Sequence, residues 1–508
     1  MDTFDAVVVG AGHNGLTTAF YLASAGKTVL VLEAREVVGG AAGTEELVPG
    51  YHFSTCAHVL RYLQPSVATD MDLAGRGLKV DQLDPYRLNV YPDGSSWIHW
   101  ADDDRTIAEL ERFSPGASRG LARWQRFWKR AARLYEPFWL SNPPTEEMLH
   151  DRAAQLGDPE LYQRLCRGNM ATLVREHFDD ERVQGAFIGA PTDPREPGSL
   201  LEAAWAAMEF DPRWVGLPRG GMGALTWAMA EAATEAGAEI RLESRVRRIV
   251  VDHERAVGVE LDEGAMIRAA IVVSNLGPKA TYLRLVEPGV FDPEFTNRVE
   301  GLSSTIGWFK AFFALAGPLN VSPYTDETRA AAYVRMCPSI DTMVEAWEDA
   351  QQGLPGREQV IQMGSFTVYD SESAPPGGSA VAVLARYVPP NPAQGWEGLR
   401  DTVTNQIIEQ VDAYLPGFRR DLVGQVAFSP ADMEDRYGMI DGNIDHIDHL
   451  PGQFFTGRPF TGEGGWDTPI PGLYCCGAGT HPGGEVSGAP GYNAARHILA
   501  VEETRNRS

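Results

Sequence analysis

Long apolar runs and C-x-x-C cysteine pairs are both missing from this chain of 508 residues. No stretch approaches the roughly 18–20 apolar residues that a membrane-spanning helix needs. The first predicted strand begins at Asp5, so we expect no signal peptide. None of the five cysteines forms a C-x-x-C pair, which makes a redox-active disulfide unfavourable. Reduced, buried thiols in a cytoplasmic protein are the simpler expectation.

A surplus of positive charge is also missing, because 69 acidic residues against 44 Lys and Arg leave a formal net charge of −25. This charge disfavours binding to nucleic acid and broad attraction to anionic lipid. The length and a hydrophobic content of 44% predict two well-packed domains. His446 and His449 have H-x-x-H spacing, but no third ligand stands out, so we expect no metal site.

The N-terminal segment carries a glycine pattern in the setting of a dinucleotide site. Gly10, Gly12 and Gly15 form G-x-G-x-x-G between an apolar strand and a helical apolar pattern. Gly10 allows a tight turn, Gly12 lets the backbone approach a pyrophosphate at the helix N-terminus, and Gly15 lets the helix pack on the strand. Glu33 ends the next strand, where a carboxylate accepts hydrogen bonds from ribose hydroxyls.

Two further glycine-rich segments complete this pattern. One, at 39–46, reads GGAAGTEE and follows Glu33 closely. The other, at 473–480, reads LYCCGAGT and is typical of a buried strand followed by a glycine-rich turn. A helical segment follows near the C-terminal end. These positions predict that most of the chain is inserted between pieces of one nucleotide-binding domain.

These segments resemble the amine oxidase and carotenoid desaturase flavoproteins. The resemblance spans nearly the whole chain and is closest to the phytoene-desaturase-related branch named pyridine nucleotide-disulphide oxidoreductase domain-containing protein 2. It implies FAD as the cofactor, with a G-G segment around the pyrophosphate in which Ala41 replaces the usual arginine. By this resemblance Val246 holds the adenine, and the other cofactor contacts are Gly39, Gly40, Thr44, Gly477, Gly479, Thr480 and Gly488.

We expect an α/β fold in which a Rossmann-like FAD-binding domain, of the glutathione-reductase or amine-oxidase type, is interleaved with an α+β substrate domain. The FAD domain is assigned to residues 1–100, 216–290 and 441–508, with a mainly helical cap at 101–215 and a mixed-sheet substrate domain at 291–440. The glycines at 220–223 lack a preceding buried strand and a following ribose acid, so no separate nicotinamide-binding domain is predicted.

Three side chains are candidates for chemistry. As part of a strand, Lys310 shares a face with Trp308 and Phe312, which is costly unless the ammonium is paired or faces a wet cavity. It resembles the flavin amine oxidase lysine that bonds through water to flavin N5; the alternative is a lysine at a strand edge reaching solvent.

Glu485 stands where the branch typically has a glycine, close to the family's isoalloxazine. It is a candidate base, a modulator of the flavin's potential, or only a capping carboxylate. His446 matches a histidine common in the branch and either contacts substrate or is structural. His58 is expected to pack rather than to react.

Residues 119–139 are predicted to form a helix with basic side chains on one side and aromatic ones on the other. One interpretation is a helix at a membrane interface that admits an apolar substrate. The favoured one is a surface helix packed on its own domain, with its basic side meeting acidic surface there or in another subunit of an oligomer.

The favoured function is an FAD-dependent desaturase or dehydrogenase that removes hydride from a largely apolar organic molecule, such as an isoprenoid or lipid, with oxygen or a quinone as acceptor. An isomerase without net redox change is a variant of it. An alternative is an FAD-dependent oxidase of an amine or other small activated substrate that produces hydrogen peroxide. A non-enzymatic flavoprotein scaffold is the third hypothesis.

Overall fold

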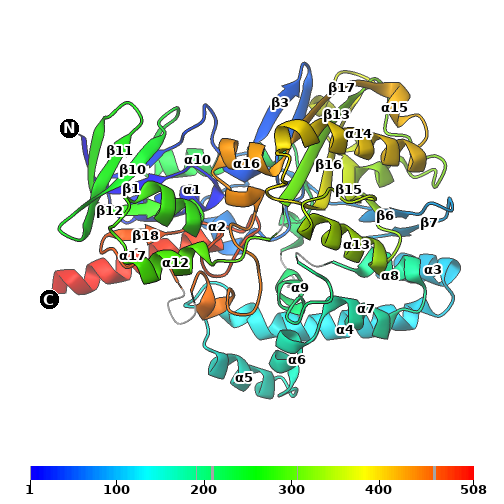
Figure 1. Ribbon diagram of the computed structural model, residues 1–508, viewed down its shortest axis with the longest axis horizontal. Helices are drawn as coiled ribbons and strands as arrows, with labels where there is room; N and C mark the ends of the chain where they lie inside the picture. The colour runs from blue at the N-terminus through cyan, green and yellow to red at the C-terminus, as the bar shows by residue number, and fades with distance from the viewer. Residues whose placement is uncertain (1, 190–191, 208–210, 306, 461–464, 508) are drawn as a thin grey trace.

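Two large sheets stand side by side in the computed structural model, which describes residues 2–189, 192–207, 211–305, 307–460 and 465–507 (Figure 1). The first sheet has the strand order β10-β11-β12-β1-β2-β9, and β18 pairs with β12. Its strands are β1 (Asp2–Val9), β2 (Val29–Leu32), β9 (Ala238–Arg241), β10 (Val246–Asp252), β11 (Arg255–Leu261), β12 (Met266–Ser274) and β18 (Leu473–Cys475).

The centre of this first sheet is parallel, because β1 pairs in parallel with both β2 and β12. Val8 belongs to the core cluster on one face and Val7 to the cluster on the other. Such burial on both faces explains the near-continuous apolar run in β1. Three long helices pack beside it: α1 (His13–Ser24) contacts both α10 (Met222–Glu235) and α17 (Ala489–Arg507).

The second sheet has the order β17-β13-β16-β15-β14-β6-β7. Its strands are β6 (Arg87–Val90), β7 (Ser96–His99), β13 (Gly307–Leu315), β14 (Val334–Met336), β15 (Val360–Ser365), β16 (Ser379–Val388) and β17 (Leu422–Phe428). Strands β6 and β7 fall within the 1–100 segment assigned to the FAD domain, yet β6 pairs with β14 and β7 with β6, so both extend the second sheet. Strand pairing over this distance along the chain has no local sequence signal.

Side chains on the two faces of β13 pack against different layers of the protein. Phe309 and Phe313 pack with α14 (Trp396–Tyr414) on the outer side of the second sheet. Trp308 and Phe312 belong to the core shared with the helical region. The alternation follows the two-residue period of a strand and places Lys310 on the inner side, with Trp308 and Phe312.

Below the second sheet in Figure 1 lies a layer of helices. They are α3 (Asp103–Phe113), α4 (Ala117–Tyr135), α5 (Glu146–Gln155), α6 (Leu161–Arg167), α7 (Met170–His177), α8 (Glu181–Phe187) and α9 (Leu200–Ala206). Side-chain caps fix several starts: the Asp102 carboxylate accepts from the Arg105 N–H at 2.8 Å, and the Asn169 side chain accepts from Thr172 N–H at 2.8 Å.

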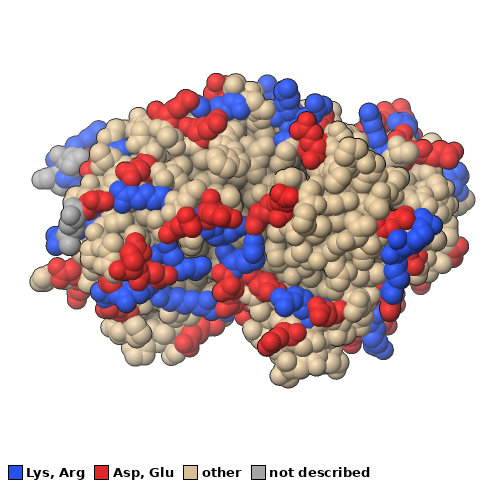
Figure 2. All heavy atoms as spheres, turned by 90° about the horizontal axis from the view of Figure 1, so that it is seen from above, with Lys and Arg blue, Asp and Glu red and all other residues tan. Residues whose placement is uncertain are grey.

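Shorter elements connect these layers, and they are α2 (Pro65–Asp70), α11 (Pro278–Ala280), α12 (Pro293–Glu300), α13 (Ile340–Gln351), α15 (Phe418–Asp421), α16 (Pro430–Tyr437), β3 (Thr44–Val48), β4 (Tyr51–Ser54), β5 (Val80–Asp81) and β8 (Leu217–Pro218). Within the described ranges, no helix combines the length and the apolar character required to cross a bilayer. Figure 2 shows acidic and basic side chains interspersed over one face, without a large area of a single sign.

Candidate active site

One continuous cavity of about 1620 Å³ runs between the two sheets and down to the helical layer. Typical ligand pockets measure about 300–1,000 Å³, so this cavity has room for a large cofactor and a second molecule. At one end it is lined by the glycine turn after β1, and at the other by Trp308 of β13 and Trp124 of α4. The cavity therefore joins elements of all three layers.

The dinucleotide end is built from the predicted glycine turn. Gly10, Gly12, Glu33, Gly40 and Val246 all line the cavity. The Glu33 carboxylate is buried and accepts backbone N–H groups from the turn (2.9 Å) and from its own loop (3.0 Å). A Cβ on Gly12 would lie 2.7 Å from the Asn275 amide nitrogen, so any side chain here would require the Asn275 side chain to move. This concave, glycine-lined channel beside a helix N-terminus fits the pyrophosphate and ribose of FAD.

Other predicted cofactor residues do not line the cavity but build its frame. A Cβ on Gly15 would overlap the Gly10 carbonyl, and the Thr44 hydroxyl accepts from Gly223 N–H at 2.8 Å at the start of α10. Thr480 is buried, and its hydroxyl donates to the Gly477 carbonyl at 2.9 Å. The others placed behind the wall, where a side chain would meet neighbouring atoms, are Gly39, Gly477, Gly479 and Gly488.

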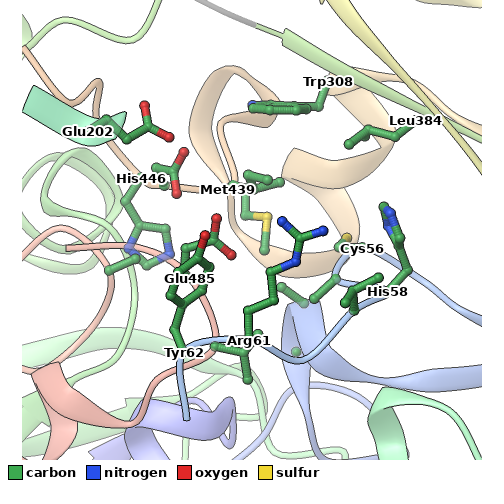
Figure 3. A pocket seen from close by; sticks show the side chains of 18 of the residues that line it. Cys56, His58, Arg61, Tyr62, Glu202, Trp308, Leu384, Met439, His446 and Glu485 are labelled. Carbon is green, nitrogen blue, oxygen red and sulfur yellow. The ribbon is translucent and has the colours of Figure 1, made fainter. Parts of the chain in front are cut away.

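Glu485 and His446 meet on the cavity wall (Figure 3). Both have left-handed backbone, with φ of 64° and 68°, a conformation that side chains rarely adopt and that often occurs at functional sites. The Glu485 side chain is open to the cavity, and burial within the protein together with nearby Asp445 raises its pKa to about 7. Burial, with the nearby Arg458 guanidinium, lowers the pKa of His446 to about 3, and its Nδ1 accepts from Gly479 N–H at 3.3 Å.

His13, inside the glycine turn, is a wall residue that sequence reasoning missed. Its Nε2 lies 3.1 Å from the carbonyl oxygen of Glu485, which joins the N-terminal turn to the C-terminal turn. Burial lowers the pKa of His13 to about 4, so the ring donates this hydrogen bond as neutral imidazole. The non-glycine positions of the G-x-G-x-x-G motif could have indicated His13 as a site residue, because they lie in the same turn as the glycines.

Lys310 is fully buried in β13, which lies between β16 and β17, so it does not reach solvent at a sheet edge. Its Nζ lies 3.1 Å from Nδ1 of His58, and it is His58 that lines the cavity. Burial lowers the pKa of Lys310 to about 8, and burial together with the lysine's charge holds the pKa of His58 well below its usual range. The wall therefore presents a neutral imidazole backed by an ammonium.

Helix α4 covers most of residues 119–139, and its aromatic side packs inward. Leu121, Phe127, Trp128 and Tyr135 are buried in the core shared with neighbouring helices. The exposed side carries the basic residues Arg119, Arg123, Arg126, Lys129, Arg130 and Arg133. In this structure the apolar side contacts the protein's own domain.

The cavity and its dinucleotide end define an FAD-dependent oxidoreductase. The flavin containing amine oxidoreductase family matches residues 15–499, and the chain belongs to this family.

Relatives are similar over nearly the full length. The mouse (Mus musculus) pyridine nucleotide-disulfide oxidoreductase domain-containing protein 2 is 31% identical, over 98% of this chain and 93% of that protein. A lycopene-forming phytoene desaturase of Pseudescherichia vulneris is 26% identical, over 98% and 99%. The fold is that of a redesigned putrescine oxidase, with a TM-score of 0.63, 16% identity and 99% of each chain covered.

Proposed function

We propose that this FAD-dependent oxidoreductase is a desaturase or dehydrogenase that removes hydride from an organic molecule with a largely apolar body, and that oxygen or a quinone takes up the electrons. One observation carries the proposal: a single cavity connects the glycine turn and Glu33 with the aromatic wall at Trp308 and then with α4. Similarity to a phytoene desaturase supports the same reaction class.

Bound FAD supplies the acceptor for the hydride. Desaturation also releases a proton from the neighbouring carbon, and the Glu485 carboxylate faces the cavity with a pKa of about 7, suited to accept it at neutral pH. Trp308 and Leu384 provide apolar wall on the substrate side. The protein's remaining contribution is to hold the reacting carbons in place and to exclude water.

An oxidase acting on an amine or other small activated substrate depends on the lysine reaching the flavin. Here His58, rather than Lys310, forms the wall, with the ammonium bonded to its Nδ1. That arrangement favours the dehydrogenase over the peroxide-producing oxidase.

The test is to purify the protein with its flavin, photoreduce it without oxygen, and compare reoxidation by oxygen with reoxidation by a soluble quinone. Slow reaction with oxygen and fast reaction with quinone is the expected result. Fast reaction with oxygen supports the oxidase instead. Failure to bind FAD would overturn the cofactor assignment as well.

A further inference from the structure

The substrate end of the cavity is rich in arginine. Arg61, Arg87, Arg335 and Arg386 all line it. Two of them have structural partners: the Arg335 guanidinium donates to carbonyl oxygens of the α8 region, including Gly185 at 3.1 Å, and Arg87 donates to the Ala186 carbonyl at 2.9 Å. These two arginines brace the wall.

Arg61 differs, because within the described residues it makes no hydrogen bond or ion pair. Its guanidinium carbon lies 5.0 Å from the ring centre of Tyr86 and 5.8 Å from that of Tyr333, and its Nε is buried without a hydrogen-bond partner. In Figure 3 the guanidinium projects into the open space between Glu485 and His58. A guanidinium held away from bulk water is costly when no anion is hydrogen-bonded to it, so this position favours an anionic ligand.

The acidic groups that face this region offset its positive charge only in part, although Glu485 and Arg61 do attract each other across the cavity. Glu202, Asp445 and Glu485 line the same cavity, but none forms an ion pair with Arg61 in the part of the chain that the structure describes. Burial raises the pKa of Asp445 to about 6 and of Glu485 to about 7, and holds that of Glu202 well above its usual range. Lys310, behind His58, adds a further positive charge.

Within the described residues at the entrance beside α4, basic side chains outnumber the one exposed acid, Asp103, which accepts a hydrogen bond from Gln125. Arg126 and Lys129 of α4 are exposed and also line the cavity, so the cavity opens beside them. Trp124 and Trp128 of the same helix also line the cavity, with their ring centres 5.4 Å apart. On a chain with a net charge of −25, a basic entrance with aromatic walls favours an anion that carries an apolar body.

The anion is expected at the substrate end rather than on the cofactor's pyrophosphate. Tyr86 and Tyr333, which flank Arg61, directly precede strands β6 and β14 of the second sheet. The glycine turn that fits the pyrophosphate follows β1 of the first sheet, and Ala41 leaves that segment without its usual arginine.

We propose that the substrate is a carboxylate with a largely apolar body, and that Arg61 binds its carboxylate group. The planar guanidinium matches a carboxylate with two parallel hydrogen bonds, and Tyr86 and Tyr333 hold its plane. Trp308 and Leu384 then contact the apolar body. This inference rests on the proposed dehydrogenase function and narrows its substrate class.

The experiment titrates the FAD-loaded protein with decanoate, decanol and decylamine and follows the change in flavin absorbance. The variants are Arg61→Gln, Arg61→Lys and, as matched control, Arg357→Gln, whose side chain is 82% exposed and lies outside the cavity wall. We expect decanoate to bind on the order of 30-fold more tightly than decanol. Arg61→Gln should weaken decanoate binding by a similar factor and leave decanol binding unchanged. Arg61→Lys should recover part of the lost decanoate affinity, and Arg357→Gln should bind both compounds like the wild type.

Equal affinity of the wild type for decanoate and decanol, or tightest binding of decylamine, would overturn the proposal without any variant. So would equal weakening of acid and alcohol by Arg61→Gln. A shifted flavin reduction potential with decanoate binding intact would assign Arg61 to the cofactor instead. The titration measures binding and needs no turnover. If decanoate binds but no organic substrate reduces the flavin, the carboxylate-binding inference stands and the proposed dehydrogenase function fails.

Discussion

Replacing Lys310 by Met is expected to stabilise the protein at neutral pH. The lysine is fully buried, and burial lowers its pKa from 10.5 to about 8, which corresponds to about 3 kcal/mol of disfavoured charge. Met occupies a similar volume without charge. Loss of the 3.1 Å contact with His58 offsets about 1 kcal/mol of this gain in stability. Lys310→Met should therefore raise the free energy of unfolding by about 2 kcal/mol at pH 7.

The pH dependence supplies the sharper part of this prediction. The folded protein releases the Lys310 proton near pH 8, whereas the unfolded chain keeps it to about pH 10.5. Between these values the unfolded state binds more protons, so the stability of the wild type rises with pH relative to the variant. The advantage of Lys310→Met is full below pH 8 and disappears as the pH rises toward 10.5.

Thermal unfolding of both FAD-loaded proteins, followed by release of flavin fluorescence at pH 7 and pH 10, measures this difference. Lys79→Met, at an exposed lysine, is the control and should change nothing at either pH. A variant that is less stable than the wild type by the same amount at both pH values would refute the reasoning. It would mean that the buried ammonium makes a stabilising contact that outweighs its desolvation.

Three further changes have defined outcomes. Glu485→Gln should lower the rate of substrate-driven flavin reduction by roughly 10²–10⁴-fold and remove the rise in rate as pH increases through about 7, measured by stopped flow; an inflection that persists near pH 7 assigns it to another group. Gly15→Ala should abolish FAD retention, read as the flavin-to-protein absorbance ratio, because its Cβ overlaps the Gly10 carbonyl, whereas Gly398→Ala, where a Cβ meets nothing, should retain it. Glu33→Ala should weaken FAD by about tenfold or more in apoprotein titrations, because two backbone N–H groups lose their buried acceptor; unchanged affinity would show that the turn holds without it.

Local sequence patterns predicted the strand, turn and helix at the dinucleotide end. Gly10, Gly12 and Glu33 act through their immediate neighbours, so a strand, a turn and a helix can be inferred from the order of small and apolar residues.

The substrate end could not be predicted in the same way. Arg61 lies in an irregular segment between β4 and α2, where no period indicates which side chains face inward. The partner of Lys310 is His58, which lies 252 positions away and was expected only to pack. Such pairs depend on how an irregular segment packs against a distant strand, which short-range propensity does not specify.

Strand β18 pairs with β12 and is followed by the turn that carries Glu485, whose carbonyl accepts from His13 near the other end of the chain. During synthesis the glycine turn leaves the ribosome early, and this last strand leaves late. A nascent or prematurely stopped chain that ends before Leu473 therefore lacks one wall of the cofactor cavity. FAD retention therefore distinguishes chains in which β18 pairs with β12 from chains that lack this strand.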